Sequence, residues 1–273
     1  MVPSATVTTE NPVGVFDSGV GGLSVLREIR NELPCEDLLY VADSGYAPYG
    51  DRAQEFIQTR ATEIVRFLVG QHAKAVVVAC NTATGVAIDT LRSQFSIPLV
   101  AIEPAVKPAA SMTKSGVVGI LATTQTLSSS KFTRLLAGYS DKVRFLVQPC
   151  PGLVEQVEKG EWSSHATRTL VEQYVLPLLE QGADTIVLGC THYPFLDRVI
   201  RSVAGLEVAV VDPAVAVARE LRRRLQMQDL LSRDNRTGTD RFWTSGSPDE
   251  VQAVMDLIWM KRVDLQSMPS DFR

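Results

Sequence analysis

Eight short runs of β-branched and aliphatic residues recur along this chain of 273 residues, and their regular spacing is the strongest constraint on its fold. Each run is continuously apolar, which is typical of strands buried on both faces of a sheet. Amphipathic stretches of helical length lie between them, as at 54–70, 83–95 and 165–181. This alternation predicts an α/β fold with parallel sheets. The runs cover residues 13–17, 38–42, 75–79, 98–102, 117–121, 143–148, 185–189 and 208–211.

Two of these runs lead into similar segments, which indicates two related halves. VVVACNTAT (76–84) and IVLGCTHYP (186–194) both pass from an apolar strand into a cysteine followed by polar residues. A segment rich in Pro, Ala and Ser, near 103–114, lies between them. We expect two similar parallel-sheet α/β domains with the active site in the cleft between them. Their predicted bounds are 1–104 plus 214–273, on the Cys80 side, and 105–213, on the Cys190 side.

Charge and hydropathy indicate which classes of partner the chain is expected to lack. The formal charge is −4, and Lys and Arg are dispersed, so we expect no binding to nucleic acid. No apolar stretch approaches the roughly 20 residues of a membrane helix, and residues 1–12 lack the features of a signal peptide. We therefore expect a cytoplasmic protein without a membrane partner. The first dozen residues are expected to be disordered.

The four cysteines, at 35, 80, 150 and 190, lie far apart without a CxxC pair, so we expect reduced thiols. Cys80 and Cys190 follow predicted strands, at the edge where parallel sheets bind ligands. Cys80 also opens a predicted helix, whose N-terminal N–H groups favour a thiolate. His192 can hydrogen-bond the Cys190 thiol or exchange a proton with it, although it could also merely brace its loop.

A pair of thiols, one from each half, suits the inversion of a carbon centre. One thiol removes a proton from one face, and the other returns a proton to the opposite face. A single group would return the proton to the face it came from. The Cα proton of an amino acid is weakly acidic, so fixed donors must also stabilise the carbanion. No lysine lies in a recognisable pyridoxal phosphate setting, and we expect no cofactor and no metal.

The segment DSGVGGLS (17–24) is a candidate source of such donors. It offers Ser18, together with backbone N–H groups that the glycines would allow to approach an anion closely. It is not a dinucleotide loop, because Ser24 occupies the third glycine position of G-x-G-x-x-G.

Two carboxylates and several neutral groups complete the candidate site. Asp17 could contact a substrate ammonium or assist proton transfer near Cys80. Glu155 could do the same near His192, or it could be a solvated helix residue. The neutral candidates for substrate binding are Ser18, Tyr49, Gly50, Asn81, Thr82 and Thr191.

Five segments together resemble the glutamate racemases of the aspartate/glutamate racemase superfamily, in the same order over about residues 13–213. The resemblance implies two α/β domains around a cleft, no cofactor, and interconversion of L- and D-glutamate for peptidoglycan synthesis. The segments are FDSGVGGLSVL (16–26), YVADSGYAPYG (40–50), VVACNTAT (77–84), PCPGLVE (149–155) and LGCTHYP (188–194).

The same resemblance implies a role for each matching residue. Cys80 and Cys190 would be the two catalytic thiols, each serving one enantiomer, and Asp17, Glu155 and His192 would assist proton transfer. We also expect a homodimer. The residues implied to bind substrate are Asp17, Ser18, Tyr49, Gly50, Asn81, Thr82, Thr191 and His192.

Two alternatives stay open on the sequence alone. One is a related racemase that acts on aspartate or another small acid. The other is a non-catalytic binding or redox protein in which Cys80, Cys190 and His192 hold zinc or form a switchable disulfide. No fourth zinc ligand is evident for that alternative.

Overall fold

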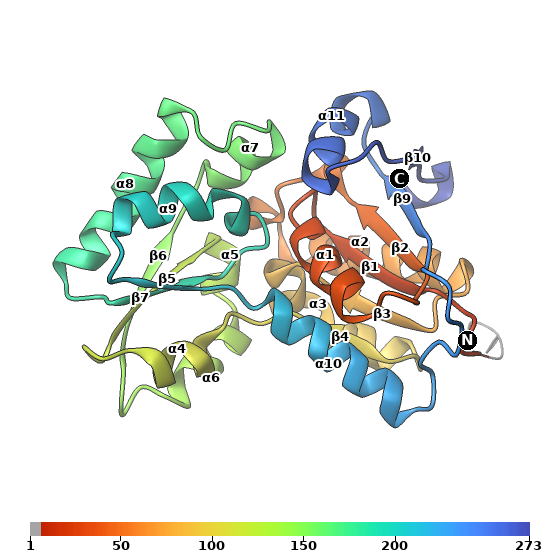
Figure 1. Cartoon of the computed structure of the whole chain (residues 1–273), viewed down its shortest axis with the longest axis horizontal. Coiled ribbons are helices and arrows are strands. Elements are labelled where there is room, and N and C mark those ends of the chain that lie inside the picture. The colour runs from red at the N-terminus through yellow and green to blue at the C-terminus, as the bar shows by residue number, and fades with distance from the viewer. Residues whose placement is uncertain (1–6) are drawn as a thin grey trace.

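The computed structural model describes residues 7–273 and contains two lobes side by side, each a parallel sheet with helices on both faces (Figure 1). All eight apolar runs form strands, and the predicted α/β class with parallel sheets is confirmed. Two later strands, β9 and β10, were not predicted. Within residues 7–273 no helix is long and apolar enough to cross a membrane.

The first lobe is built on a six-stranded sheet of order β10-β9-β2-β1-β3-β4. Its core strands are completely buried, because helices cover both faces. Its last two strands come from the end of the chain. The bounds are β1 Val13–Asp17, β2 Leu38–Ala42, β3 Ala75–Val78, β4 Leu99–Ala101, β9 Asp240–Thr244 and β10 Leu265–Ser267.

The second lobe is built on a four-stranded sheet of order β6-β5-β7-β8. Its strands are β5 Val117–Ala122, β6 Arg144–Pro149, β7 Thr185–Leu188 and β8 Ala209–Val211. This order repeats the order β2-β1-β3-β4 of the first lobe. Strands β3 and β7 therefore occupy equivalent places in the two lobes, and we retain the predicted domain bounds as a proposal.

Helices cover each sheet on two sides, and apolar side chains join them to the strands. In the first lobe α1, α10 and α11 lie against one face, while α2 and α3 lie against the other. In the second lobe α7, α8 and α9 cover one face, and α4 and α6 cover the other. The bounds are α1 Leu23–Glu32, α2 Gln54–Gly70, α3 Asn81–Gln94, α4 Val106–Met112, α5 Thr124–Leu127, α6 Ser130–Ala137, α7 Leu153–Glu158, α8 His165–Glu180, α9 Asp197–Ala204, α10 Ala214–Met227 and α11 Pro248–Trp259.

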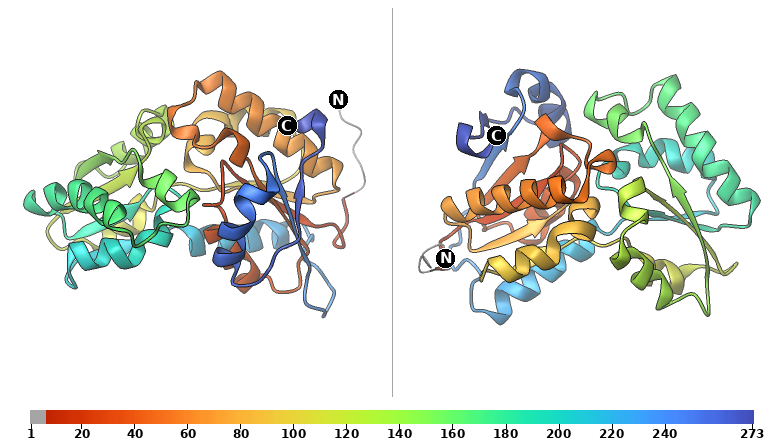
Figure 2. Two further views of the ribbon diagram at one scale, coloured as in Figure 1. Left: turned by 90° about the horizontal axis from the view of Figure 1, so that it is seen from above. Right: turned by 180° about the vertical axis from the view of Figure 1, so that it is seen from behind.

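After the second lobe the chain returns to the first. Helices α10 and α11 both contact α1, and β9 pairs with β2 in parallel. The C-terminus and β1, the first strand of the chain, consequently lie in the same lobe, as the views from above and behind show (Figure 2).

A buried ion pair connects four distant segments of the first lobe. The Nζ atom of Lys74 lies 2.6 Å from Glu36 Oε2 and also donates to the Thr9 carbonyl oxygen at 2.6 Å. Glu36 in turn accepts a hydrogen bond from the Ser232 backbone N–H at 2.8 Å. The expectation of a disordered N-terminus is therefore wrong for residues 7–12, which this pair anchors. Residues 1–6 lie outside the described residues.

Replacing Lys74 with methionine should lower the free energy of unfolding by about 3–5 kcal/mol, because Glu36 is left buried without its cation. The double variant Lys74→Met/Glu36→Gln should recover most of this loss, since no uncompensated charge remains. Urea denaturation of the three proteins measures both values. Equal stability of the single and double variants would contradict this account of the pair.

In the second lobe, hydrogen bonds to the carboxylate of Asp184, which precedes β7, connect distant segments. Its carboxylate accepts hydrogen bonds from Thr113 Oγ1 at 2.6 Å, from the backbone N–H groups of Lys114 and Ser115 at 2.7 Å each, and from Thr185 Oγ1 at 2.9 Å. Burial alone would raise the pKa of Asp184, but these hydrogen bonds lower it to about 2. The carboxylate thus holds the connection between α4 and β5 against β7.

The stabilisation from Asp184 should depend on pH in a defined window. Because its pKa is lowered in the folded protein, the contribution is complete above the ordinary value of 3.8 and is lost as the pH falls toward 2. The difference in thermal midpoint between the wild type and Asp184→Asn should be constant from pH 7 to about pH 4 and should narrow below it. A difference that widens on acidification would refute this assignment.

Candidate active site

A small pocket lies between the carboxyl ends of the strands of the two lobes. It lies where parallel sheets place their ligand sites. Every candidate site residue predicted from the sequence lines it, except Asp17 and Glu155. Its lining is Ser18, Pro48, Tyr49, Gly50, Cys80, Asn81, Thr82, Thr123, Val154, Cys190, Thr191 and His192.

Cys80 stands at the N-terminus of α3, directly after β3, as predicted. Its Sγ accepts a hydrogen bond from the Ala83 backbone N–H at 3.4 Å, and its thiol donates to Ser18 Oγ at 3.7 Å. The Ala83 N–H group favours the thiolate, as expected, but other effects raise the pKa of Cys80 on balance. Burial raises the pKa of Cys80, and the charge of Asp17 raises it further. Hydrogen bonds that Ala83 and the Ser18 hydroxyl can donate to the thiolate offset only part of this effect. Burial therefore favours the neutral thiol of Cys80 over its thiolate.

Cys190 follows β7 and has a different neighbourhood. Its Sγ lies 3.7 Å from His192 Nδ1, and His192 Nε2 lies 2.6 Å from Glu158 Oε1. Burial lowers the pKa of His192, but hydrogen bonds with Cys190 and Glu158 raise it more, leaving it well above its ordinary value. A thiol, an imidazole and a carboxylate thus form a chain in which the third group orients the second.

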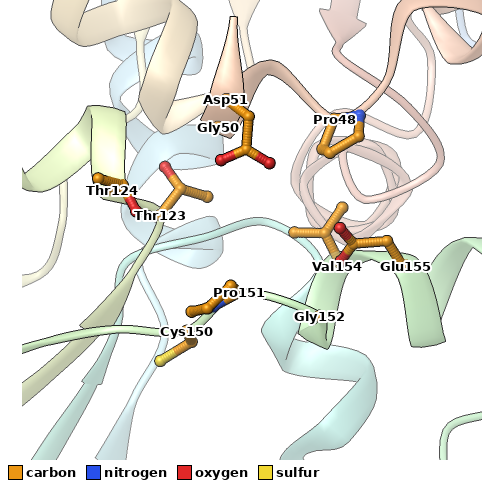
Figure 3. A pocket seen from close by; sticks show the side chains of 10 residues that line it. All are labelled: Pro48, Gly50, Asp51, Thr123, Thr124, Cys150, Pro151, Gly152, Val154 and Glu155. Atoms are coloured by element: carbon orange, nitrogen blue, oxygen red, sulfur yellow. The ribbon is translucent and has the colours of Figure 1, made fainter.

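The carboxylate that contacts His192 is Glu158, and the sequence-based choice of Glu155 for this contact is wrong. Glu155 instead lines a neighbouring pocket together with Asp51 and Cys150 (Figure 3). The two glutamates are one turn apart on α7. Glu158 follows the buried Val154 by four residues, which places it on the inward face of the helix. Glu155 lies one turn away on the same helix, so this spacing alone does not distinguish the two glutamates.

Asp17 lies beneath the pocket rather than on its wall. It is fully buried, and its carboxylate accepts hydrogen bonds from the Gly19 backbone N–H and from Thr191 Oγ1, both at 3.1 Å. Burial raises the pKa of Asp17, while the positive charge of His192 opposes this rise. The contact with Thr191 joins the end of β1 to the segment after β7, so Asp17 links the two lobes.

Tyr49 and Gly50 lie on a loop that lines the pocket, but the Tyr49 hydroxyl is hydrogen-bonded to a residue of the protein. Tyr49 donates its hydroxyl proton to Asp43, which Arg60 also binds through two nitrogen atoms. The Tyr49 hydroxyl cannot donate the same proton to a substrate carboxylate. Arg60 further donates to the Phe272 carbonyl oxygen at 3.0 Å, so the end of the chain helps to hold this loop.

The first turn of α3 supplies polar groups of two kinds. Both side-chain amide atoms of Asn81 are buried and have no hydrogen-bond partner among residues 7–273, so they are available to a ligand. The Thr82 hydroxyl is instead engaged with those of Thr123 and Thr126, at 2.9 and 3.2 Å.

Metal-binding groups do not assemble here. Across the part of the chain that the structure describes, no cluster of three or more His, Cys, Asp and Glu side chains is arranged to hold a metal ion. Cys35, Cys80, Cys150 and Cys190 are all free thiols.

The fold and the site can now be compared with known proteins. Residues 14–221 match the family model of Asp/Glu/Hydantoin racemase. Over 263 residues the chain is 52% identical to a glutamate racemase of Methylococcus capsulatus, covering 96% of this chain and 97% of the relative.

Solved structures agree. A glutamate racemase isoform of Bacillus anthracis superposes with a TM-score of 0.88 at 33% identity, covering 96% of this chain and 98% of that one. The Escherichia coli glutamate racemase, in complex with L-glutamate and the activator UDP-MurNAc-ala, gives a TM-score of 0.82 at 30% identity, over 94% and 97% of the two chains.

The chain belongs to the Asp/Glu/hydantoin racemase family. Within that class of isomerases it is an amino-acid racemase.

The contact between Glu158 and His192 predicts which glutamate matters for racemisation. Glu158→Gln should lower kcat by about tenfold or more, because His192 loses a charged partner that orients it. The matched variant Glu155→Gln should stay near wild type, since Glu155 does not contact His192. Initial rates of optical rotation change measure both. A larger loss in Glu155→Gln than in Glu158→Gln would reverse the assignment.

Proposed function

We propose that this protein is a glutamate racemase that needs no cofactor and uses Cys80 and Cys190 as its two acid–base groups. The observation that carries the proposal is the placement of the two thiols. They follow equivalent strands, β3 and β7, since the order β6-β5-β7-β8 of the second lobe repeats β2-β1-β3-β4 of the first, and both line one pocket. A substrate in that pocket has one thiol from each lobe beside it.

In the proposed reaction the thiolate of one cysteine takes the Cα proton, so the Cα–H bond breaks and an S–H bond forms. The thiol of the other cysteine then gives its proton to the opposite face of the carbanion. In the direction that begins at Cys190, Cys80 is the donor, and its raised pKa keeps it protonated for that step. His192 can exchange a proton with Cys190 at the 3.7 Å contact.

Neutral groups around the pocket would bind the substrate and stabilise charge. The free amide of Asn81 can donate to a carboxylate and accept from an ammonium group. Ser18, Gly50 and Thr191 also line the pocket beside it, and Thr191 connects it to Asp17. Preorganised donors of this kind stabilise a carbanion that water would stabilise less well.

Glutamate is the proposed substrate because curated relatives at about half identity are glutamate racemases and the Escherichia coli structure contains L-glutamate. We further propose that the product D-glutamate serves peptidoglycan synthesis and that the enzyme acts in the cytoplasm. The homodimer predicted from the sequence remains a prediction, which light scattering of the purified protein tests.

Cys80→Ala and Cys190→Ala should each lower the rate of glutamate racemisation by about 10²–10⁴-fold, because inversion needs an acid–base group on each face. Circular dichroism of L- and D-glutamate solutions measures the rates. Cys35→Ala is the matched control, since Cys35 lies far along the chain from both thiols, and it should keep the wild-type rate. Full turnover by either active-site variant would rule out the two-thiol mechanism.

The same assay separates the alternatives. Faster inversion of L-aspartate than of L-glutamate would overturn the proposed substrate. Metal analysis of the purified protein tests the non-catalytic alternative, which stoichiometric zinc that a chelator removes along with folding would support.

A further inference from the structure

The loop of residues 17–22, which the sequence suggested as an anion-binding segment, binds an anion of the protein itself. The Val20 backbone N–H donates to Glu158 Oε1 at 2.8 Å, and the loop belongs to the first lobe while Glu158 belongs to the second. Ser24, just beyond the loop, donates its hydroxyl to the Thr191 carbonyl oxygen at 3.0 Å. The loop of the first lobe therefore supports Glu158 and the segment that carries Thr191 in the second lobe.

Two glycines of this loop have no room for a side chain, for a reason that lies in the other lobe. A Cβ atom on Gly19 would overlap Glu158 Oε1 and come within 2.8 Å of its Cδ. A Cβ atom on Gly21 would overlap His192 Nδ1 and come within 2.5 Å of its Cε1. Neither glycine has a positive φ, so the backbone itself would accept any L-residue. What excludes a side chain at these two residues is the space that Glu158 and His192 occupy.

His192 is thereby restrained from several sides. Its Nδ1 faces Cys190, its Nε2 faces Glu158, and its ring rests on Gly21. Asp17 adds a negative charge from the end of β1. Since Glu158 is itself fixed by Val20, the orientation of the imidazole depends on how closely the second lobe approaches the loop.

We propose that Gly19 and Gly21 are positioning residues of the racemase, whose missing side chains allow Glu158 and His192 to dock on the loop and so set the contact between His192 and Cys190. This inference rests on the proposed function for its kinetic consequence, but the docking itself does not depend on the substrate. Cys80 lies on the other wall of the pocket, where it contacts Ser18 and Ala83, so its position does not depend on this docking.

The consequence of a methyl group at either glycine follows from this geometry. In Gly19→Ala the atoms that must move are the far end of the flexible Glu158 side chain, so the fold should survive while the hydrogen bonds to Val20 and His192 are lost. In Gly21→Ala the imidazole ring must shift. A displacement of about 1 Å in a catalytic group can cost about 10²-fold in rate.

The experiment compares the wild type with Gly19→Ala, Gly21→Ala and the control Gly70→Ala. Gly70 ends α2, and a Cβ atom there would meet nothing within 4 Å. We expect both loop variants to keep the wild-type far-ultraviolet dichroism and to lose about 10- to 100-fold in kcat with a smaller change in KM, whereas Gly70→Ala changes neither. Wild-type kcat in both loop variants, or an effect on KM alone, would overturn the proposal.

Rescue distinguishes docking from a general loss of structure. Glu158→Asp shortens the acidic side chain by one methylene and frees the space that a Cβ atom at residue 19 needs. The double variant Gly19→Ala/Glu158→Asp should be faster than Gly19→Ala alone, although Glu158→Asp by itself is slower than wild type. No recovery in the double variant would contradict the proposed docking.

A second readout does not require racemisation of glutamate. The chain has only three histidines, so histidine-labelled protein gives few ring signals in NMR, and His192→Asn identifies that of His192. Because the contact with Glu158 helps to raise the pKa of His192, its titration should move to lower pH in Gly19→Ala and partly return in the double variant. An unchanged titration in Gly19→Ala refutes the docking. Failure of the wild type to racemise glutamate would refute only the proposed function.

Discussion

Charge buried at the junction of the two lobes is the constraint on which the site depends. Asp17 and His192 are almost wholly removed from water, and a buried charge is costly unless hydrogen bonds and an opposite charge compensate it. Each lobe donates a hydrogen bond to a carboxylate of the other. Thr191 of the second lobe donates to Asp17 of the first, and Val20 of the first donates to Glu158 of the second. Asp17 and Glu158 thus each gain a hydrogen bond that exists only when the lobes meet.

The two thiols occupy equivalent places in the fold but not equivalent environments. After β3 the chain enters α3 directly, so Cys80 lies at the N-terminus of a long helix and has only a hydroxyl and a backbone N–H as partners. After β7 a short 3₁₀ turn, Tyr193–Leu196, precedes α9, and His192, which lies just before this turn, contacts Cys190. Repetition of the fold places the thiols, whereas the local geometry after each strand gives them different chemistry.

The sequence predicted those features of the fold and site that depend on local residue patterns. Continuous apolar runs identified eight strands, but β9 and β10 escaped because β9 begins with charged residues and β10 is short and mostly exposed. Polar residues after β3 and β7 were correctly placed at one pocket, since parallel strands end at the same edge. Glu158 could not be chosen over Glu155 without the docking of α7. The helix N-terminus at Cys80 was predicted, but the burial that outweighs it is a property of the assembled lobes.

The return of the chain to the first lobe explains why the loop of residues 17–22 can serve as a fixed support. The loop leads directly into α1, and α1 contacts both α10 and α11. Arg30 of α1 also bonds to Asp240 at 2.7 Å and to the carbonyl oxygen of Thr239, so β9 holds the far end of the helix. A loop held only by its own strand and helix would move with them. Segments from the last quarter of the chain restrain it instead, and the second lobe closes against a surface that the rest of the fold has already positioned.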